Sequence, residues 1–362
     1  MKVSYAQGLR GQFSTVPPVV TADLSGQTVV VVGANTGIGL EATKHFARMN
    51  PARLILACRS QVKGTAAVAS VMKDTDYTKA EVWIIDLGSF SSIIAFAERF
   101  EKDGGRLDIL VMNAGVATPL YEATADGYES TYVFPRSIIV PPLTVDNSTS
   151  LQVNHLGTSL LSLLLLPTMV NTANKESTVS RLVIVSSDMH YHADISKDAQ
   201  AAPSILAKLN SKEYSTKSVM RARYQVTKLL NVFFTRALSS RLSPTTPIIV
   251  TSTNPGFCYS ELLRNLPFLL RLISRLAQWI FAFTTEEGSR QLVYAALGGK
   301  DDPEKMKGAF VNMGAVQEVS DYVLGEEGGR VQERIWNETI DILIGVTPKV
   351  KEVVDQYLLV AY

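Results

Sequence analysis

Cysteine is almost absent from this sequence, in which Cys58 and Cys258 are the only two in 362 residues. So few thiols exclude a disulfide framework and fit a reducing compartment. Met1–Asp23 contains no basic stretch followed by an apolar run, so no secretory signal is visible. We therefore expect a cytoplasmic protein, with Cys58 as a small buried hydrophobe at the end of an apolar run.

A strong charge of one sign and a long hydrophobic run are also missing. The 35 basic and 34 acidic residues leave a formal net charge of +1. This balance gives no electrostatic reason to expect nucleic acid as a partner. The most apolar segment, Leu160–Leu166, ends at Pro167 and is well short of the ~20 residues that a membrane span needs. We expect it to be a buried helix.

Short β-branched runs alternate with helical patterns, such as Glu41–Met49 and Ser91–Glu101, along most of the chain. Continuous apolar strands between helices predict an α/β doubly wound parallel sheet, a Rossmann fold of about seven strands. No linker divides the pattern, so we expect one domain over residues 25–345, with substrate-lid helices near its C-terminal end, an N-terminal extension at 1–24 and a C-terminal tail at 346–362. The expected strands are Thr28–Val32, Arg53–Ala57, Val82–Ile85, Ile109–Met112, Leu182–Ser186, Ile248–Ser252 and Ala309–Asn312.

A glycine-rich segment follows the first expected strand and opens a helix. It reads Gly33-Ala34-Asn35-Thr36-Gly37-Ile38-Gly39. Glycines let the backbone approach a pyrophosphate, and the helix N-terminus offers free N–H groups and a positive dipole. Its place between a strand and a helix favours a dinucleotide site over a structural turn.

The spacing G-x-x-x-G-x-G and its surroundings closely resemble the short-chain dehydrogenase/reductase family, within it the retinol-dehydrogenase-like branch and its fungal members of secondary metabolism. The resemblance runs from Ser25 to about Leu343 and implies an oxidoreductase. It departs from the family at Val32, where Thr is usual, and at Met112, where Asn is usual. A polar link between those two strands is therefore in doubt.

Cofactor choice depends on the end of the second strand. Arg59 stands where an NAD enzyme would carry an acid, and its guanidinium can pair with a 2′-phosphate. We expect NADP(H), although a solvated surface arginine is the alternative. By resemblance, the glycine segment contributes Gly33, Asn35, Thr36, Gly37, Ile38 and Gly39 to cofactor binding, and the later loops contribute Asp86, Leu87, Asn113, Ala114, Gly115, Pro255, Gly256 and Ser260.

Tyr224 and Lys228 are one helical turn apart, which places a phenol and an ammonium on one face. A nearby cation favours phenolate, so we expect Lys228 to lower the tyrosine pKa. By resemblance, Tyr224 is the acid/base, Lys228 also binds the nicotinamide ribose, Ser187 polarises the carbonyl, and Asn154 supports a proton path to the lysine. His155 is expected to be packed, and His190 lies on the loop after Ser187. Neither is expected to be catalytic, and the sequence shows no metal-ligand spacing.

Tyr132–Ser150 interrupts a stretch that is continuous in the retinol-dehydrogenase-like branch. Pro135, Pro141 and Pro142 would not be tolerated inside a helix, so the segment must form a loop. Two explanations are open: translated intron sequence, or a real insertion that reshapes the mouth of the site.

The substrate end of the chain is apolar, which suggests a lipophilic small-molecule substrate. The segment between Ser187 and Tyr224 is expected to be a long loop that walls a hydrophobic pocket with Met189, Tyr191, Leu206, Tyr214 and Met220. Further on, Leu262–Phe283 has an amphipathic pattern, with three arginines (Arg264, Arg271, Arg275) on one face. It could form a substrate lid, a homodimer interface or a membrane-surface helix, and the lid is favoured.

Three functions fit these residues. The first is an NADP(H)-dependent reduction of a carbonyl, or oxidation of the alcohol, in a lipophilic compound. The second is an epimerase or dehydratase that uses NADP without net redox change. The third is a catalytically silent NADP-binding scaffold, which the intact Ser187, Tyr224 and Lys228 disfavour.

Overall fold

The computed structural model describes residues 12–116, 124, 126, 151–259, 278 and 281–359. Within them, eight strands form one sheet in the order β3-β2-β1-β4-β5-β6-β7-β8. All neighbouring strands are parallel except β7 and β8. The strands are β1 (Thr28–Val32), β2 (Arg53–Cys58), β3 (Ala80–Ile84), β4 (Ile109–Met112), β5 (Ser180–Val185), β6 (Ile248–Thr253), β7 (Phe310–Asn312) and β8 (Ala315–Gln317).

The expected fold class is confirmed, and each expected strand lies within two residues of an observed one. The eighth strand was not predicted. Ala315–Gln317 has three exposed residues and, within the described residues, pairs with β7 alone. It therefore lacks the buried apolar pattern by which the other strands are recognised.

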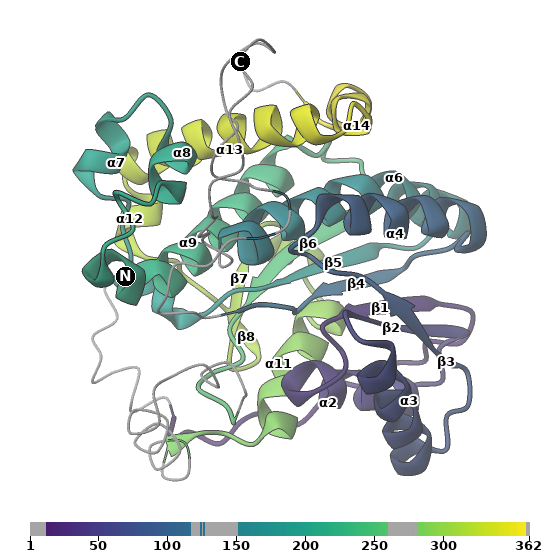
Figure 1. Cartoon of the computed structure of the whole chain (residues 1–362). Helices are drawn as coiled ribbons and strands as arrows, with labels where there is room; N and C mark the ends of the chain where they lie inside the picture. The colour runs from purple at the N-terminus through teal and green to yellow at the C-terminus, as the bar shows by residue number, and fades with distance from the viewer. Residues whose placement is uncertain are drawn as a thin grey trace.

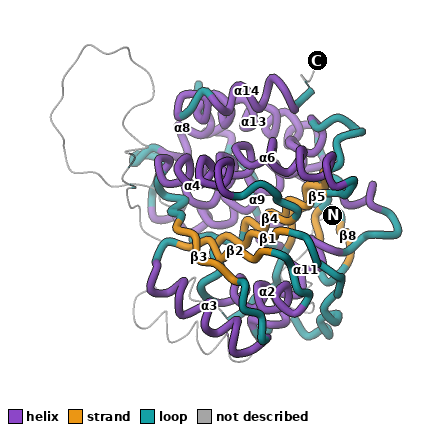
Figure 2. The backbone as a smooth tube through the Cα atoms, turned by 90° about the vertical axis from the view of Figure 1, so that its right-hand side faces the viewer, coloured by secondary structure: helices purple, strands orange, loops and turns teal. Residues whose placement is uncertain are grey.

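Helices cover both faces of the sheet, as the parallel connections require. Figure 2 shows the sheet between the two helical layers. One face carries α4 (Phe90–Asp103), α6 (Gly157–Glu176) and α9 (Lys217–Arg241), and the other carries α2 (Gly37–Arg48), α3 (Gln61–Thr75) and α11 (Thr285–Leu297).

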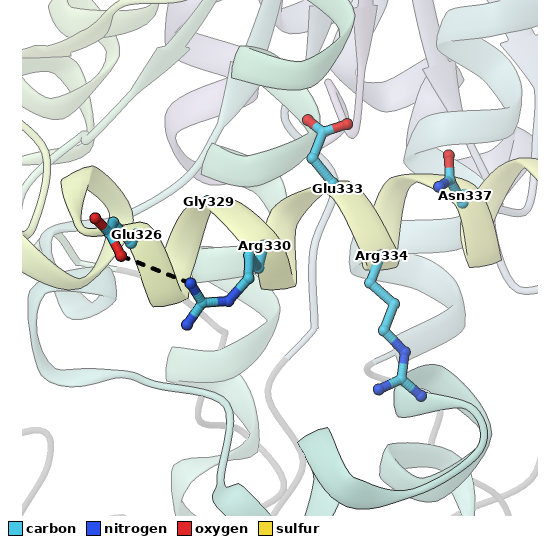
Figure 3. A pocket seen from close by; sticks show the side chains of 6 residues that line it. All are labelled: Glu326, Gly329, Arg330, Glu333, Arg334 and Asn337. Atoms are coloured by element: carbon cyan, nitrogen blue, oxygen red, sulfur yellow. Dashed lines mark ion pairs between the residues drawn. The ribbon is translucent and has the colours of Figure 1, made fainter. Parts of the chain in front are cut away.

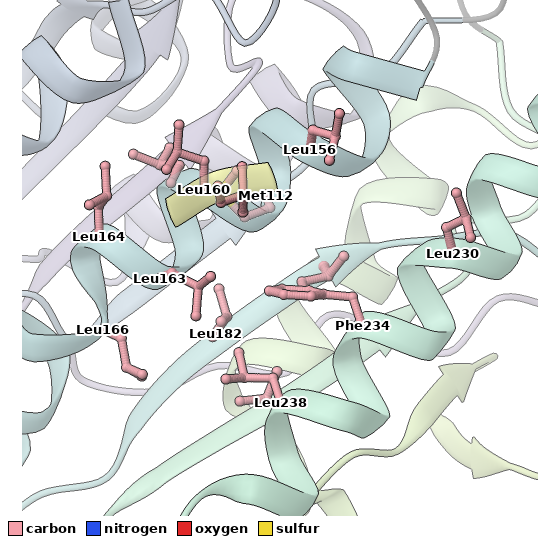
Figure 4. Close-up of a cluster of buried hydrophobic side chains, with 14 of the residues drawn as sticks. Met112, Leu156, Leu160, Leu163, Leu164, Leu166, Leu182, Leu230, Phe234 and Leu238 are labelled. Atoms are coloured by element: carbon pink, nitrogen blue, oxygen red, sulfur yellow. The ribbon is translucent and has the colours of Figure 1, made fainter. Parts of the chain in front are cut away.

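Helix α6 is the centre of the larger core. Its leucines pack against strand residues Met112 and Leu182 and against α9 (Figure 4). The helical stretch Gln152–Glu176 is long and apolar enough to cross a membrane by composition, but 83% of its most apolar window is buried inside the protein. This confirms the expected buried helix, which continues through Pro167 to Glu176.

The segment between Ser187 and Tyr224 is helical rather than the expected long loop. It contains η2 (Asp188–His192), α7 (Lys197–Ala201), α8 (Ile205–Asn210) and the start of α9. Leu206 is fully buried in the main core, so it does not wall a pocket. The prediction of a loop was wrong because the segment is rich in turn-forming residues. Its three short helices each begin with a capping serine, a residue that is also common in turns.

The expected tail after residue 345 is part of the packed structure. Helix α13 (Glu326–Val346) crosses that boundary, and α14 (Lys349–Tyr357) lies beside α6. Val350 is fully buried in the main core. The outer layer also contains α12 (Asp321–Leu324), while η3 (Pro303–Met306) precedes β7.

Candidate active site

The site residues gather where the parallel strands end. The loops that follow β1, β2, β3, β4, β5 and β6 carry Gly33, Arg59, Asp86, Asn113, Ser187 and Pro255 respectively. Carboxyl ends of parallel strands meet at one edge of a sheet, which is where open α/β sheets bind ligands. Tyr224 and Lys228 come from α9, and Asn154 from the π-helical turn η1 (Gln152–Leu156) that precedes α6.

The glycine segment forms a close turn into α2. Gly33 and Gly37 have φ values of +81° and +60°, which favour glycine. A Cβ atom on Gly39 would lie 2.3 Å from the carbonyl oxygen of Gly33, so only glycine fits there. Thr36 begins α2 without a side-chain cap, which leaves the first-turn N–H groups available to an anion.

The loops after β1 and β4 are joined by a polar link. Asn113 donates its Nδ2 hydrogen to the carbonyl oxygen of Gly33 at 3.0 Å. A polar link between the ends of these strands therefore exists although Val32 and Met112 replace the usual polar residues. A Cβ on Gly33 would lie 2.8 Å from the Cα of Ala114, so the two turns touch through their backbones.

Arg59 lies exposed just beyond β2 and forms no ion pair with the described part of the chain.

Asp86 follows β3, and its carboxylate accepts a hydrogen bond from the N–H of Gly88 at 2.9 Å. Leu87 is buried, and a Cβ on Gly157 would approach its carbonyl oxygen to 2.4 Å. The loop after β3, which was predicted to contribute to cofactor binding, is thus fixed against the start of α6.

The loop after β6 is held by the N-terminal segment. Gly256 has φ +79°, and a Cβ there would lie 2.8 Å from the ring of Phe283. The Gln12 amide donates to the carbonyl oxygens of Phe257 (2.9 Å) and Phe281 (3.0 Å), and accepts from the N–H of Phe257 (3.0 Å). Sequence reasoning gave no role to Gln12, whose partners are some 250 positions away.

Tyr224 and Lys228 lie on the same face of α9, as predicted. The Lys228 Nζ is 5.5 Å from the centroid of the Tyr224 ring and donates to the carbonyl oxygen of Val185 at 2.8 Å. Ser186 donates to the carbonyl oxygen of Lys228 at 2.8 Å. These two bonds fix α9 against the end of β5.

Asn154 and Lys228 both lie next to Gly115. A Cβ on Gly115 would lie 3.4 Å from Asn154 Oδ1 and 3.6 Å from Lys228 Nζ. Asn154 Oδ1 accepts from the N–H of Val116, while its Nδ2 donates to the Val116 carbonyl oxygen at 2.8 Å and to Thr227 Oγ1 at 3.1 Å. The side chain is therefore fixed in place beside the lysine. Its role in a proton path stays a prediction.

Ser187 begins η2 at the end of β5. Its hydroxyl donates to Asp188 Oδ1 at 3.1 Å and accepts from the N–H of Met189 at 3.2 Å. His190 Nδ1 donates to the Ser187 carbonyl oxygen at 2.8 Å, since a carbonyl can only accept. Asp188 and His190 thus hold the serine in place, and no sequence pattern had pointed to Asp188.

The pKa of Tyr224 is raised, not lowered as the i, i+4 spacing suggested. Burial is the main cause, followed by the negative charge of Asp188 and then by Cys258. Lys228 is not among the causes of this shift, and burial lowers the pKa of Lys228 itself to about 8. The spacing of Tyr224 and Lys228 predicts that the two groups are neighbours, but it does not predict how far burial shifts their pKa values.

Both histidines in question are packed. His155 is fully buried with Nε2 2.9 Å from Thr339 Oγ1, and burial lowers its pKa to about 3. The ring centroids of His190 and Phe310 are 4.5 Å apart, and burial lowers the pKa of His190 to about 4. Both are neutral near pH 7. Among the described residues, no group of three His, Cys, Asp or Glu could hold a metal ion.

Several expected parts of the site cannot be placed. Ser260, the insertion Tyr132–Ser150 and the three arginines of the expected lid lie outside the described residues. Of the expected pocket wall, Met220 is buried, and Tyr191 and Tyr214 pack against the main core.

A separate hollow lies on the outer face of α13. Glu326, Arg330, Glu333 and Arg334 line it, together with Gly329 and Asn337 (Figure 3). It is open and contains none of the predicted site residues, so we do not assign it to the chemistry.

The residues at the strand ends fit a dinucleotide. Only glycine can occupy positions 33 and 39, and the α2 N-terminus has uncapped N–H groups for a pyrophosphate. Lys228 and Asn154 lie next to Gly115 and offer polar atoms to a ribose.

The family is that of the short-chain dehydrogenases, whose family model matches residues 27–195. The chain is 39% identical to short chain dehydrogenase sol3 of Alternaria solani, over 77% of this chain and 88% of the relative. It is 32% identical to short chain dehydrogenase/reductase dmxR8 of a Cryptosporiopsis species, over 92% and 95% of the two chains. The chain therefore belongs to the short-chain dehydrogenase/reductase family, and it is an oxidoreductase with a nicotinamide cofactor, NAD(H) or NADP(H).

Solved structures show the same fold. A short chain dehydrogenase structure from Pseudomonas syringae has a TM-score of 0.55 and 18% identity, covering 83% of this chain and 100% of that one. Salutaridine reductase from Papaver somniferum has a TM-score of 0.53 and 22% identity, covering 79% and 99%. At these identities the likeness carries the fold and no substrate.

Proposed function

We propose that this oxidoreductase uses NADP(H) to reduce a carbonyl, or to oxidise the corresponding alcohol, in a lipophilic small molecule of fungal secondary metabolism. The observation that carries the proposal is the meeting of Tyr224, Lys228, Asn154 and Gly115 beside the glycine cradle. We also propose that it belongs to the retinol-dehydrogenase-like branch.

The proton chemistry follows from the chain's own residues. A general acid must hold its proton until the carbonyl oxygen accepts it, and the raised pKa keeps the Tyr224 phenol protonated. Ser187 supplies a hydroxyl for the same oxygen. When bound, the cofactor supplies the hydride. Lys228, with a pKa near 8, can hold or release a proton next to the phenol.

Arg59 supports NADP(H). It lies exposed after β2, where a carboxylate would repel a 2′-phosphate, and no described acidic residue neutralises it. Guanidinium pairs with phosphate bidentately, which gives geometric as well as charge selectivity.

The apolar composition near the substrate end supports a lipophilic substrate, and Phe257 and Tyr259 are exposed in the loop after β6. We propose a cytoplasmic protein with a small-molecule substrate and no nucleic acid partner. A homodimer, or contact with a membrane surface, would involve the amphipathic segment Leu262–Phe283.

The test is NADPH oxidation with a panel of aryl ketones and aliphatic aldehydes, for the parent and Tyr224→Phe. Loss of the phenol should lower kcat by at least ~100-fold, because a positioned general acid contributes about that much. Tyr77→Phe is the control: its hydroxyl donates to the Pro51 carbonyl oxygen, away from the site, and its rate should be unchanged. Equal rates for Tyr224→Phe and the parent would remove the phenol from the mechanism. NADP binding without turnover of any substrate would instead favour the scaffold.

A further inference from the structure

The hydroxyl of Ser187 is already engaged. A serine hydroxyl has one proton to donate. Here it points at Asp188 Oδ1, 3.1 Å away, while the lone pairs accept from Met189 N–H at 3.2 Å. A carbonyl oxygen needs that same proton to be polarised. With Asp188 ionised, the serine must therefore break a bond before it can serve the substrate.

Asp188 is well placed to change this arrangement. It is partly buried beside the serine, and burial raises its pKa above that of an ordinary aspartate, opposed by the Ser187 hydrogen bond and by His192. The carboxylic acid form therefore persists to higher pH than usual. As an acid, Asp188 can donate to the serine oxygen instead of accepting from it.

The groups that face Asp188 come from several elements. His192 and Tyr191 belong to η2, Tyr224 faces it from α9, and Cys258 from the loop after β6. The three acids among them are held neutral, since burial raises the pKa of Tyr191 to about 12 and of Cys258 to about 12, and raises that of Tyr224. Lys228 of α9 donates to the Val185 carbonyl oxygen.

We propose that Asp188 is a positioning residue for Ser187: its carboxylate accepts the serine proton, and its carboxylic acid frees that proton for the oxygen of the substrate. The proposal rests on the carbonyl reduction proposed above. No proton is consumed at Asp188 during turnover. The acid takes its proton from solvent, keeps it while donating to Ser187 Oγ, and the proton that reaches the substrate still comes from Tyr224.

The pH profile of kcat/KM for NADPH-dependent reduction of an aryl ketone, α-tetralone, tests this role. In the parent, kcat/KM should fall roughly tenfold as pH rises through the Asp188 pKa. Outright loss of an oxyanion donor costs more, about 100-fold or above, but the serine can still reorient. Tyr224, whose pKa is raised, and Lys228, whose pKa is about 8, titrate in the same site, so the Asp188→Asn variant identifies the part of the fall that belongs to Asp188.

Asp188→Asn should remove the fall, because an amide donates to Ser187 Oγ at every pH. Asp194→Asn, an exposed aspartate six positions on, should keep it. In a Ser187→Ala background, Asp188→Asn should have no effect on the profile, since Asp188 acts through the serine. An Asp188→Asn profile that still falls like the parent's would overturn the proposal, as would a fall that persists without Ser187.

A second measurement is independent of activity. NMR titration of ¹³Cγ-labelled aspartates in the full chain should show the Asp188 pKa rising in Ser187→Ala, because a hydrogen bond to the carboxylate is lost. An unchanged pKa would contradict the pairing. If no ketone or aldehyde is reduced at all, the proposed function fails, while this titration still decides whether Ser187 and Asp188 are coupled.

Discussion

The glycine turn after β1 meets the Asn113 turn after β4 through backbone atoms, whereas the loop after β6 is held by side chains from distant parts of the chain. On the cofactor side, Gly33, Gly39 and Asn113 lie at the ends of the neighbouring strands β1 and β4. On the substrate side, Gln12 joins Phe257 to Phe281. The backbone contact between the two turns has no room for an added atom. The loop after β6, in contrast, can lose a side-chain hydrogen bond and stay folded.

Gly39→Ala is the change that should affect the comparison most. Its Cβ would lie 2.3 Å from the Gly33 carbonyl oxygen and 2.5 Å from Asn113 Nδ2. Overpacking of this kind costs ~1–3 kcal/mol, and we expect NADPH affinity to fall by about 10- to 100-fold. Fluorescence titration with NADPH measures it.

Gly329→Ala is the matched control for that change. A Cβ on Gly329, in α13, meets nothing within 4 Å, so the variant should bind NADPH normally and gain up to about 1 kcal/mol of stability. Normal NADPH binding by Gly39→Ala would show that the cradle is not as closed as the geometry requires.

Arg59→Ala should have an intermediate effect on the cofactor side. A charge-assisted hydrogen bond contributes ~1.5–3 kcal/mol, and an exposed guanidinium gives less. We therefore expect NADPH to bind about tenfold more weakly while NADH affinity stays unchanged. Parallel titrations with NADPH and NADH measure this ratio.

Arg330→Ala, an exposed arginine paired with Glu326 in the α13 hollow, provides the comparison and should leave both affinities alone. Should Arg59→Ala weaken NADH and NADPH equally, Arg59 does not read the 2′-phosphate.

Gln12→Ala should have the smallest effect and should fall on the substrate side. It removes three partly exposed hydrogen bonds, each of net value ~0.5–1.5 kcal/mol at most. We expect KM for the carbonyl substrate to rise about threefold to tenfold, with NADPH affinity and kcat almost unchanged. Initial rates at varied ketone concentration separate the two constants.

Gln61→Ala removes an amide that bonds Thr65 on the exposed side of α3 and should change neither constant. If Gln12→Ala lowered NADPH affinity instead, the distinction between a cofactor side and a substrate side of the site would be contradicted.

The cofactor side could be predicted because its signals are local. The turn that needs glycines, the strand before it and the helix after it are consecutive in the sequence, and Asn113 follows directly on β4. The substrate side offered no such signal. Short capped helices between Ser187 and Tyr224 resembled a loop, and Leu206 became part of the core because α13, over a hundred positions later, covers it.

By itself the sequence determined the order of the seven strands β1 to β7, the glycine cradle, and the spacing of Tyr224 and Lys228, because each depends on neighbouring residues and on backbone sterics. Only the tertiary structure decided the pKa values of Tyr224 and Asp188 and the attachment of Gln12 to the loop after β6. These depend on how deeply a group is buried and on what lies across from it, and both are set by packing between segments that are distant in the chain.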